Sequence, residues 1–302
     1  MALRAFSFAI YFLIMFSSAC AAELDGASDP QALPDLRVAT GSNDIAEAWL
    51  IDPVTRYPHY VLGSNYEAGG LRLRTPDGRV LTLQLDEAQV FEDRLPRLAD
   101  LDSDGRDEIV LVLTSVTRGA SLAAFSVEGE SIVLKAQTPY IGQPFRWLNP
   151  AGIADFDGDG RLDVAFVAMP HLVKRLEFWT LKGGNFVKIA EADGFSNHRN
   201  GSTHTGMSAV ADFNGDGIAD LALPGADRQS LHFVTLAGGY FEKIQTKKLP
   251  EPADTTFVTI KADDQQSWPT EDQLRRGFVV LPPLSSKNIH IMIDGYLIDT
   301  GS

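Results

Sequence analysis

Three acidic loops of the same pattern recur along the chain at nearly constant spacing, and they constrain the fold more than any other feature. The loops begin at Asp100, Asp155 and Asp212, which are 55 and 57 residues apart. In each loop, side-chain oxygens stand at positions 1, 3, 5 and 9, glycine stands at position 6, and an apolar run follows directly. A fixed period of this length is typical of architectures in which one supersecondary unit is repeated.

A second motif follows each acidic loop. Residues 176–189 and 231–244 are identical at nine of their fourteen positions, and a weaker copy occupies residues 122–129. The motif predicts two strands joined by a tight turn that contains glycine. Since one further strand is expected on each side of the acidic loop, every unit has about four strands, which predicts the blades of a β-propeller.

Two flanking regions keep the strand pattern but lack the acidic loop. Residues 71–85 predict a hairpin with its turn at residues 75–78, and residues 289–295 look like a degenerate copy of the hairpin motif. We therefore predict an all-β fold, with a single propeller domain over residues 36–302. Five four-stranded blades are expected, with six as the alternative, and three of the blades carry an acidic loop.

The first 21 residues have the features of a secretory signal peptide. Arg4 precedes a mostly apolar run at residues 6–16, which is too short to span a bilayer, and small residues follow at a suitable cleavage site before Ala22. We expect export to the periplasm or the extracellular space, with residues 22–35 as a flexible segment before the propeller. Cys20, the only cysteine, lies in the signal, and its lipidation is an alternative although the preceding residues match a lipidation motif poorly.

The chain carries a formal net charge of −14. An acidic surface of this strength repels phosphate backbones and anionic lipids, which argues against nucleic acid and membrane surfaces as partners. No apolar segment long enough to span a bilayer follows the N-terminal run. The acidity also calls for counter-cations, and the acidic loops are where we expect them to bind.

The donor chemistry of the acidic loops favours Ca²⁺. This ion takes about 6–8 oxygen ligands at about 2.3–2.6 Å, and the glycine at position 6 permits the sharp turn that brings such ligands together. An EF-hand shares the opening of the pattern but requires glutamate at position 12 and helices on both sides. Position 12 is instead Leu111, Phe166 or Leu223, each inside an apolar strand, so the EF-hand interpretation is rejected for all three loops.

The three loops, each followed by a short apolar strand, resemble FG-GAP or VCBS repeats, which occur in the propellers of integrin α-subunits and in many exported bacterial proteins. The resemblance implies a propeller in which each loop holds Ca²⁺ through four side chains and one backbone carbonyl. The implied ligands are Asp100, Asp102, Asp104, the Arg106 carbonyl and Glu108; Asp155, Asp157, Asp159, the Arg161 carbonyl and Asp163; and Asp212, Asn214, Asp216, the Ile218 carbonyl and Asp220. The first loop departs from the family pattern, because it has glutamate at position 9 with Asp107 beside it.

A ligand-binding face is expected at the end of the blades opposite the acidic loops. Strands of a blade alternate in direction, so the acidic loops and hairpin turns share one end and the remaining connections share the other. The connections at that other end contribute a group of cationic, histidine and aromatic side chains: Arg118, Arg146, Trp147, His171, Arg175, His198, Arg199, His204 and Arg228. Such a group indicates a site for an anionic or glycan ligand. The alternative is a set of ordinary solvated loop residues, with Trp147 packed between blades.

The sequence favours a binding or adhesion module over an enzyme. It contains no nucleophile elbow, phosphate-binding glycine loop, dinucleotide fingerprint or zinc-protease helix, and the spacing of His198 and His204 is a weak metal signal. We expect a monomer with structural Ca²⁺ and a protein or glycan partner. A propeller hydrolase or lyase acting on polysaccharide or phosphoester is one alternative, and a lipid-anchored structural component of the envelope is another.

Overall fold

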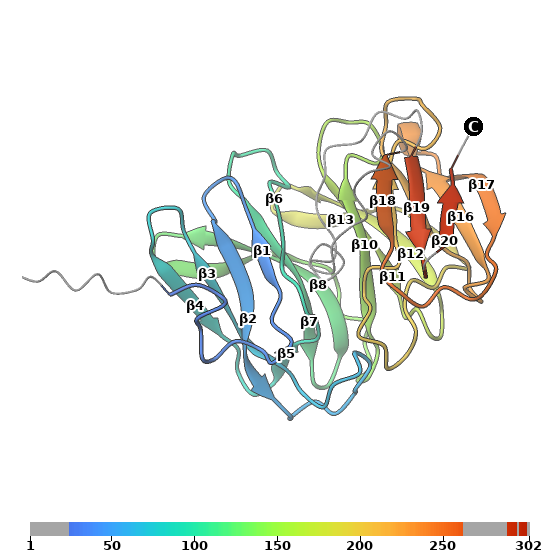
Figure 1. Cartoon of the computed structure of the whole chain (residues 1–302). Coiled ribbons are helices and arrows are strands. Elements are labelled where there is room, and N and C mark those ends of the chain that lie inside the picture. Colours follow the sequence, from blue (N-terminus) through green and yellow to red (C-terminus); the bar gives the residue numbers. More distant parts are fainter. Residues whose placement is uncertain (1–23, 262–288, 295, 301–302) are drawn as a thin grey trace, which may run out of the picture.

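The computed structural model describes residues 24–261, 289–294 and 296–300 (Figure 1). The predicted signal peptide, with Cys20, lies outside them. The regular structure of the described residues consists of strands and a single short 3-10 helix, η1 (Ala237–Gly239). None of their helices has the length and apolar character needed to cross a membrane.

The strands form antiparallel units of four, which we number as blades. The first blade comprises β1 (Val38–Thr40), β2 (Glu47–Val54), β3 (Glu67–Arg74) and β4 (Val80–Gln84). The second comprises β6 (Arg97–Ala99), β7 (Glu108–Ser115), β8 (Gly119–Glu128) and β9 (Ser131–Gln137). Between them, β5 (Gln89–Phe91) pairs with both β3 and β7 and joins the two blades into one sheet.

The later units repeat the same order. The third blade comprises β10 (Leu148–Ala154), β11 (Asp163–Ala168), β12 (Arg175–Lys182) and β13 (Asn185–Asp193). The fourth comprises β14 (Ala209–Ala211), β15 (Asp220–Pro224), β16 (Ser230–Thr235) and β17 (Glu242–Lys248). A three-stranded sheet of β18 (Val258–Lys261), β19 (Ile289–Ile293) and β20 (Tyr296–Asp299) follows.

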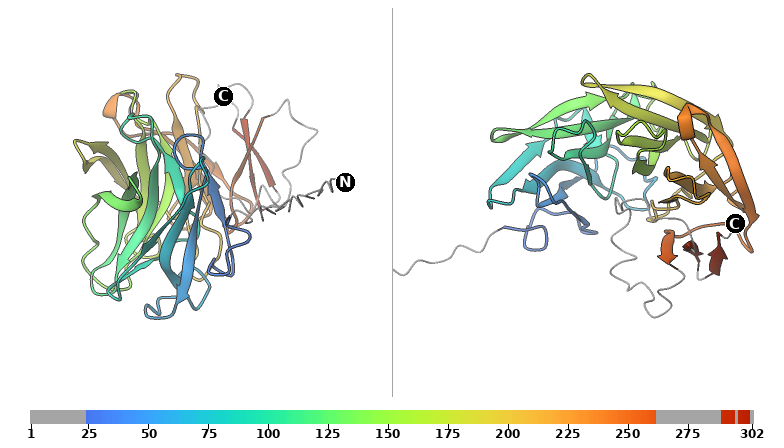
Figure 2. Two further views of the ribbon diagram at one scale, coloured as in Figure 1. Left: turned by 90° about the vertical axis from the view of Figure 1, so that its left-hand side faces the viewer. Right: turned by 90° about the horizontal axis from the view of Figure 1, so that it is seen from above.

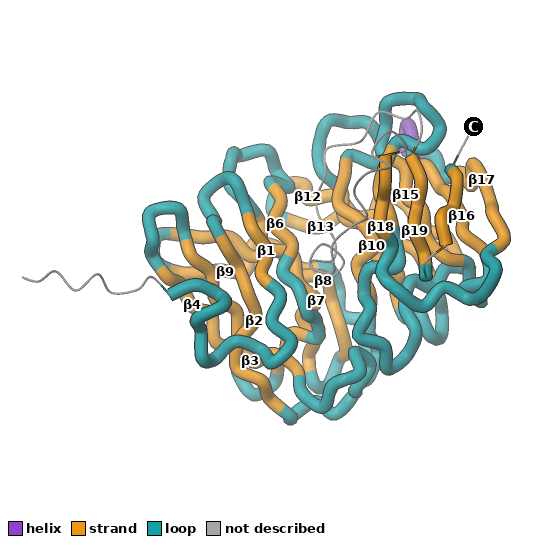
Figure 3. Tube along the Cα trace, viewed as in Figure 1, coloured by secondary structure: helices purple, strands orange, loops and turns teal. Residues whose placement is uncertain are grey.

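The sheets follow one another around a common centre in chain order, as the view from above shows (Figure 2). Neighbouring blades touch through their first strands, β1 with β6 and β10 with β14, and through their last strands, β4 with β9 and β9 with β13. Loops cap both ends of the strands (Figure 3). This radial arrangement of four-stranded antiparallel sheets confirms the predicted β-propeller fold. The number of blades stays a prediction.

Apolar side chains fill the spaces between blades. Successive residues of a strand point to opposite faces of the sheet, so Val164 and Phe166 of β11 pack toward the second blade. The alternate residues Ala165 and Val167 belong to a different cluster that includes Leu221 of the fourth blade. Because both faces of the central strands are covered, these strands are continuous apolar runs, which is why the sequence shows no alternation there.

The last strand of three blades carries a bulge at the same place. In each ladder the pairing skips one residue of the last strand, which is Lys135 in the second blade, Ile189 in the third and Ile244 in the fourth. A bulge inserts one extra residue opposite a regular partner strand and is a defined feature of a fold. Lys135, Ile189 and Ile244 therefore occupy one structural position, with a charge in one blade and an apolar side chain in the other two.

The residues that precede β1 are held against the first blade. Ala32 forms an isolated bridge with Ile51 of β2, and Leu33 is buried. Asp29 is also buried, and its Oδ2 atom accepts hydrogen bonds from Trp49 Nε1 and Arg72 Nη1, both at 2.7 Å. Part of the segment predicted to be flexible, residues 22–35, thus contributes a buried charge to the first blade.

Candidate functional site

The three acidic loops lie where the sequence places them, between the first and second strands of the second, third and fourth blades. Their position-6 glycines, Gly105, Gly160 and Gly217, have φ angles of 85°, 88° and 88°. These values fall in the left-handed region, which residues with a Cβ atom rarely adopt. Glycine is therefore required at this position by the turn itself.

The carboxylate at position 1 shapes each loop. Asp155 accepts hydrogen bonds from the backbone N–H groups of Gly158 at 2.8 Å and Gly160 at 2.9 Å. Asp100 and Asp212 each accept two backbone N–H groups of their own loops, at 2.6–3.0 Å. These bonds from the backbone to the side chain hold each loop in its turn.

The carboxylate at position 9 is buried and incompletely paired in two of the loops. Asp163 and Asp220 are fully buried; one oxygen of each accepts a backbone N–H, from Phe156 at 3.2 Å and from Phe213 at 2.9 Å. The other oxygen, Oδ1, has no hydrogen-bond partner among the described residues in either case. A buried carboxylate oxygen without a partner is costly unless a proton or a cation satisfies it.

The pKa values of these two carboxyls reflect the missing counter-charge. Burial, together with the negative charge of Asp157, raises the pKa of Asp163 to about 7. Burial likewise raises the pKa of Asp220 to about 6. Both groups are held in an environment that disfavours the negative charge, and a cation beside each oxygen would reverse that effect.

The arrangement of donors could bind a metal ion. One carboxylate oxygen from each of Asp155, Asp157 and Asp163 lies within 4.8 Å of the others, and the same holds for Asp100, Asp102 and Glu108 in the first loop. In the third loop, position 3 is an amide, whose Nδ2 donates to the position-5 carboxylate at 3.0 Å. Hard oxygen donors at this spacing, with a buried unpaired oxygen among them in the second and third loops, fit Ca²⁺.

The position-7 residues of the first two loops are arginines, and each pairs with the position-5 aspartate of its own loop. Arg106 forms an ion pair with Asp104, with nitrogen and oxygen 3.1 Å apart, and Arg161 pairs with Asp159. A guanidinium cannot ligate a cation, so a ligand role for Arg106, Arg161 and Ile218 can only fall on their carbonyl oxygens. That role stays a prediction.

The first loop differs from the other two because a lysine enters it from β9. Lys135 Nζ lies 2.6 Å from Glu108 Oε1, 2.7 Å from Asp102 Oδ2 and 3.8 Å from Asp104 Oδ2. The second oxygen of Glu108 accepts the backbone N–H of Leu101 at 2.8 Å. Sequence reasoning missed Lys135; the only signal was its alignment, in the hairpin repeat, with isoleucine in the next two copies.

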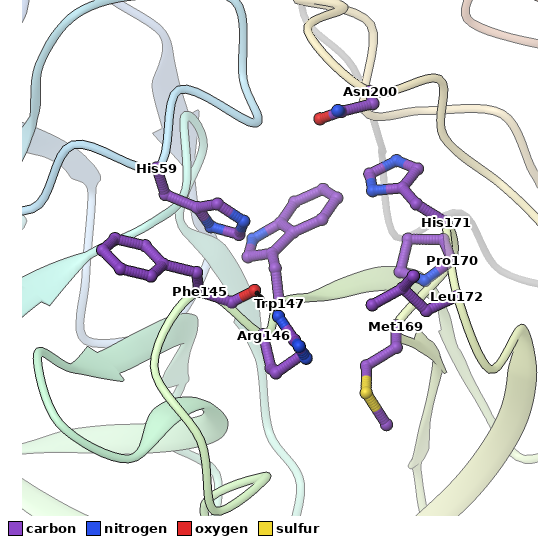
Figure 4. A pocket seen from close by; sticks show the side chains of 9 residues that line it. All are labelled: His59, Phe145, Arg146, Trp147, Met169, Pro170, His171, Leu172 and Asn200. Atoms are coloured by element: carbon purple, nitrogen blue, oxygen red, sulfur yellow. Dashed lines mark hydrogen bonds between the residues drawn. The ribbon is translucent and has the colours of Figure 1, made fainter.

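The opposite end of the blades contains a pocket of about 250 Å³ (Figure 4). Four connections form it: β2–β3, β9–β10, β11–β12 and β13–β14. Its lining residues are His59, Phe145, Arg146, Trp147, Met169, Pro170, His171, Leu172 and Asn200. The pocket thus unites Arg146, Trp147 and His171 of the predicted ligand face with His59, which was not predicted as a site residue.

Trp147 and His171 line one side of the pocket, and the buried His198 contacts both of them. Trp147 donates its indole N–H to the Glu92 carbonyl at 2.9 Å, and its ring meets His198 edge-on with centroids 4.7 Å apart. His198 Nε2 lies 3.1 Å from the Ser202 carbonyl, which can only accept, so this nitrogen carries the proton. His198 Nδ1 then accepts from His171 Nε2, 3.0 Å away.

These two histidines are neutral at neutral pH. Burial lowers the pKa of His171 to about 4, and burial together with the neighbouring His171 lowers the pKa of His198 to about 3. His171 and His198 are therefore neutral rings, and each hydrogen bond between them and the Ser202 carbonyl has one donor and one acceptor.

His59 lines the opposite side of the pocket and pairs with the buried Glu92. His59 Nδ1 lies 2.5 Å from Glu92 Oε1, and the other Glu92 oxygen accepts the Thr114 hydroxyl at 3.0 Å. Glu92 is fully buried, and burial raises its pKa against the opposing effect of the His59 hydrogen bond. Neither residue belongs to a repeat or a known motif, which is why sequence reasoning did not select them.

The remaining residues of the predicted ligand face are engaged elsewhere or exposed. Arg175 pairs with Asp193, 2.9 Å apart, and Arg199 pairs with Asp254, 2.5 Å apart. The Arg118 guanidinium lies over the Tyr140 ring, 4.0 Å from its centroid, and Arg228 donates to the Ala253 carbonyl at 3.1 Å. His204 is exposed to solvent. The predicted cationic face is thus divided, and only part of it lines the pocket.

Comparison with known proteins identifies the repeats. A family model of FG-GAP-like repeats matches residues 100–166 and residues 155–223. The chain carries FG-GAP-like repeats. The two matches together contain all three acidic loops and the strands that follow them, which confirms the resemblance noted in the sequence. No curated protein matches this chain.

Several solved structures are similar to this chain at low sequence identity. The rhamnogalacturonan lyase YesW matches with a TM-score of 0.44 and 11% identity, over 86% of this chain and 50% of the lyase. A Bacillus licheniformis rhamnogalacturonan lyase matches with a TM-score of 0.44 and 12% identity, over 89% and 59%. The exotype rhamnogalacturonan lyase YesX matches with a TM-score of 0.45 and 15% identity, over 76% of this chain and 51% of the lyase. The chain spans about half to three-fifths of the length of these structures.

Proposed function

We propose that this chain is an exported, calcium-binding propeller that acts as a binding module, with its ligand site in the pocket opposite the acidic loops. The observation that carries the proposal is the character of that pocket. Apolar and aromatic walls enclose a few directed polar groups, which is the usual composition of a site for a small ligand or part of a larger one.

Exposed apolar side chains around the pocket support the proposal. Eight large apolar residues are exposed among the described residues, and four of them, Tyr60, Phe145, Leu172 and Val173, belong to connections that form the pocket. Contiguous exposed apolar surface on a monomer often marks a binding site. Half of these exposed residues therefore lie in connections that form the pocket, and two of them, Phe145 and Leu172, line it.

The polar groups favour an acidic glycan as the ligand. Arg146 presents a guanidinium that matches a carboxylate or sulfate group. Phe145 offers an exposed aromatic face for the apolar face of a sugar ring, and Asn200 and His171 supply hydrogen-bonding atoms for hydroxyl groups. The net negative charge of the chain disfavours nucleic acid and anionic membranes as ligands. The positive charge of Arg146 therefore acts only at short range, on a ligand already in the pocket.

The proposed role of Ca²⁺ is structural, because the acidic loops lie at the end of the blades away from the pocket. An ion in the second loop would neutralise Asp163 and fix a loop that touches the fourth blade. Gly238 of that blade donates its N–H to the Asp157 carbonyl at 3.0 Å, and a Cβ atom on Gly158 would lie 2.9 Å from Ile218 Cδ1. Extracellular calcium modules work at dissociation constants of about 10⁻⁴–10⁻³ M, which agrees with export.

Binding is tested with an array of acidic and neutral oligosaccharides, probed with residues 22–302 in Ca²⁺. A binding acidic oligosaccharide is then titrated by calorimetry into the parent, Arg146→Ala and Arg175→Ala. Arg146→Ala should weaken binding about tenfold, equivalent to about 1.4 kcal/mol, because it loses one charged contact with the ligand. Arg175→Ala should bind like the parent. Arg175 serves as the matched control because it lies at the same end of the blades and pairs with Asp193. Equal losses in both variants, or no binding by the parent, would refute the proposal.

A second candidate function is an enzyme of polysaccharide cleavage, which the His59–Glu92 pair favours. A buried carboxylate that accepts Nδ1–H of a histidine leaves Nε2 as a base, as in many acid–base sites. In this candidate, Nε2 of His59 takes a proton from the sugar or from water in the pocket. The test incubates the parent and His59→Gln with the oligosaccharides that bind, and measures new reducing ends. Cleavage that is lost in His59→Gln with binding retained favours the enzyme, whereas no cleavage by the parent leaves the binding module.

The third alternative, a lipid-anchored envelope component, depends on Cys20. Mass spectrometry of the mature N-terminus distinguishes the two outcomes. A chain that begins at Ala22 supports secretion, and a diacylated Cys20 at the N-terminus supports anchoring.

A further inference from the structure

One position decides how the charge of each acidic loop is balanced. The bulge residue of the last strand is Lys135 in the second blade, Ile189 in the third and Ile244 in the fourth. Ile189 and Ile244 pack against the apolar clusters of their blades. Lys135 instead extends its amine into the first acidic loop, where it contacts the carboxylates that the family pattern assigns to the metal.

The contacts of Lys135 cover the centre of the first loop. Its Nζ atom is within 2.6–2.7 Å of Glu108 and Asp102, and 3.8 Å from Asp104. These are three of the four side chains implied as ligands there. A divalent ion bound to the same oxygens at about 2.3–2.6 Å would lie beside the ammonium group, and the two positive charges would repel each other.

The position-9 carboxylate shows the same contrast. Glu108 has a partner for each oxygen, Lys135 for Oε1 and the Leu101 N–H for Oε2. Asp163 and Asp220 each keep one buried oxygen without a partner among the described residues. The position-9 carboxylates of the second and third loops therefore each have a buried oxygen that an added cation or proton would satisfy, whereas Glu108 has none. In the first loop the buried carboxylate oxygen without a partner in the described part of the chain is Asp107 Oδ2, which is not among the implied ligands.

The first loop is also fastened to its neighbour without an ion. Asp44 of the β1–β2 connection accepts the backbone N–H of Asp107 at 2.8 Å, and Asn43 donates to the Asp107 carboxylate at 2.9 Å. These bonds tie the loop of the second blade to the first blade. A metal is thus required neither to pair the oxygens of Glu108 nor for the contact between these blades.

We propose that Lys135 is a built-in counter-cation that replaces Ca²⁺ in the first acidic loop, so that the chain binds two calcium ions and not three. The inference rests on the proposed calcium binding of the second and third loops. On this proposal, the contact between the first and second blades is stable without calcium. The third and fourth blades depend on calcium in their acidic loops.

The test counts Ca²⁺ ions by calorimetry and by native mass spectrometry on the chain of residues 22–302. The parent is expected to bind two ions, and Lys135→Ile, which copies the other two blades, is expected to bind three. Lys188→Ile is the matched control, because Lys188 lies in the equivalent strand of the third blade and pairs with Glu177 and Glu191. This control should still bind two.

Two milder substitutions keep the test decisive if Lys135→Ile folds poorly. Asp102→Ala in the parent should leave the count at two, whereas Asp157→Ala, which removes the position-3 oxygen, should lower it to one. A parent with three ions, one of which is lost in Asp102→Ala, overturns the proposal, as does a Lys135→Ile protein with the same count as the parent. A parent with no ion and a Lys135→Ile protein with one would support the role of Lys135 while refuting calcium in the other loops.

Discussion

The first and second acidic loops follow nearly the same sequence pattern but balance their charge by different means. In the first loop the counter-charge is the amine of Lys135, which is covalently part of the chain. In the second loop Asp163 is buried with an unpartnered oxygen, and its pKa is raised to about 7. The comparison teaches that a motif of ligands does not by itself establish a metal site. The residue that faces the motif from the next hairpin decides whether an ion is needed.

Removal of calcium should produce the largest effect and confine it to one part of the ring. With free Ca²⁺ at 100 times the dissociation constant, each site adds about 2.7 kcal/mol, and about 1 kcal/mol shifts the Tm of a chain of this size by about 2–4 °C. Excess chelator should therefore lower the Tm by roughly 10–20 °C if two ions are lost. Calorimetric scans with chelator and with restored Ca²⁺ measure this shift.

Hydrogen exchange locates the change. Amides of β10, β11, β14 and β15 should exchange faster in chelator, and those of β6 and β7 should not. If amide exchange becomes equally faster around all three loops, the distinction between the loops is wrong. If the Tm is unchanged in chelator, calcium does not stabilise the protein.

Neutralising the position-9 carboxylate should have opposite consequences in the two loops. In Ca²⁺, Asp163→Asn should lose one ion and about 3 kcal/mol, but in chelator it should be neutral or stabilising, because it removes a buried charge without a partner. Glu108→Gln should lose about 1–3 kcal/mol in both buffers, because it breaks a hydrogen bond to the charged Lys135 amine. Denaturant unfolding in the two buffers gives the four values. A Glu108→Gln effect that disappears in chelator would mean that an ion, not Lys135, holds the first loop.

The propeller and the acidic loops could be predicted from sequence because their determinants are local. Each loop keeps its donors within nine residues, and Gly160 supplies a turn that no other residue type makes easily. The hairpin motif repeats the order of strands, so repetition alone fixes the fold once one unit is understood. The two matches of the FG-GAP-like family rest on the same local signal.

The pocket could be predicted only in part, because its residues come together from connections that do not repeat. His59 and Trp147 come from different blades, and Glu92 follows the linking strand β5. The sequence gives no spacing that relates them. The same limit explains why Arg175 and Arg199 were expected at the ligand site: their charge was visible, but their partners Asp193 and Asp254 lie 18 and 55 residues away.

The pH dependence of stability should separate the two kinds of loop in the metal-free protein. The folded-state pKa of Asp163 is about 7, while an unfolded aspartate has a pKa of about 3.9. Between these values the folded state binds more protons than the unfolded state, so this group makes stability fall as pH rises from about 4 to about 7. The slope is at most about 1.4 kcal/mol per pH unit.

The difference between the parent and Asp163→Asn isolates this contribution, because other buried groups cancel. Glu67, with a pKa raised to about 8 by burial, adds a slope of the same sign, and His198, with a pKa lowered to about 3, adds the opposite sign below about pH 6.5. In chelator the free energy of unfolding of the parent should decline relative to Asp163→Asn across this window. In saturating Ca²⁺ the decline should vanish, and a decline that persists would argue against an ion at Asp163.

The smallest effect is expected from the arginine beside the second loop. Arg161 pairs with Asp159 at the surface, and exposed ion pairs contribute about 0–1 kcal/mol. Arg161→Ala should therefore change the free energy of unfolding by less than about 0.5 kcal/mol, and the Ca²⁺ count should stay at two, because the alanine keeps the carbonyl implied as the ligand. Arg106→Ala in the first loop is the matched control and should behave alike. A fall in calcium affinity in Arg161→Ala alone would show that the guanidinium, by holding Asp159, helps to form the site, and the second loop would then depend on a protein cation as well as on the metal.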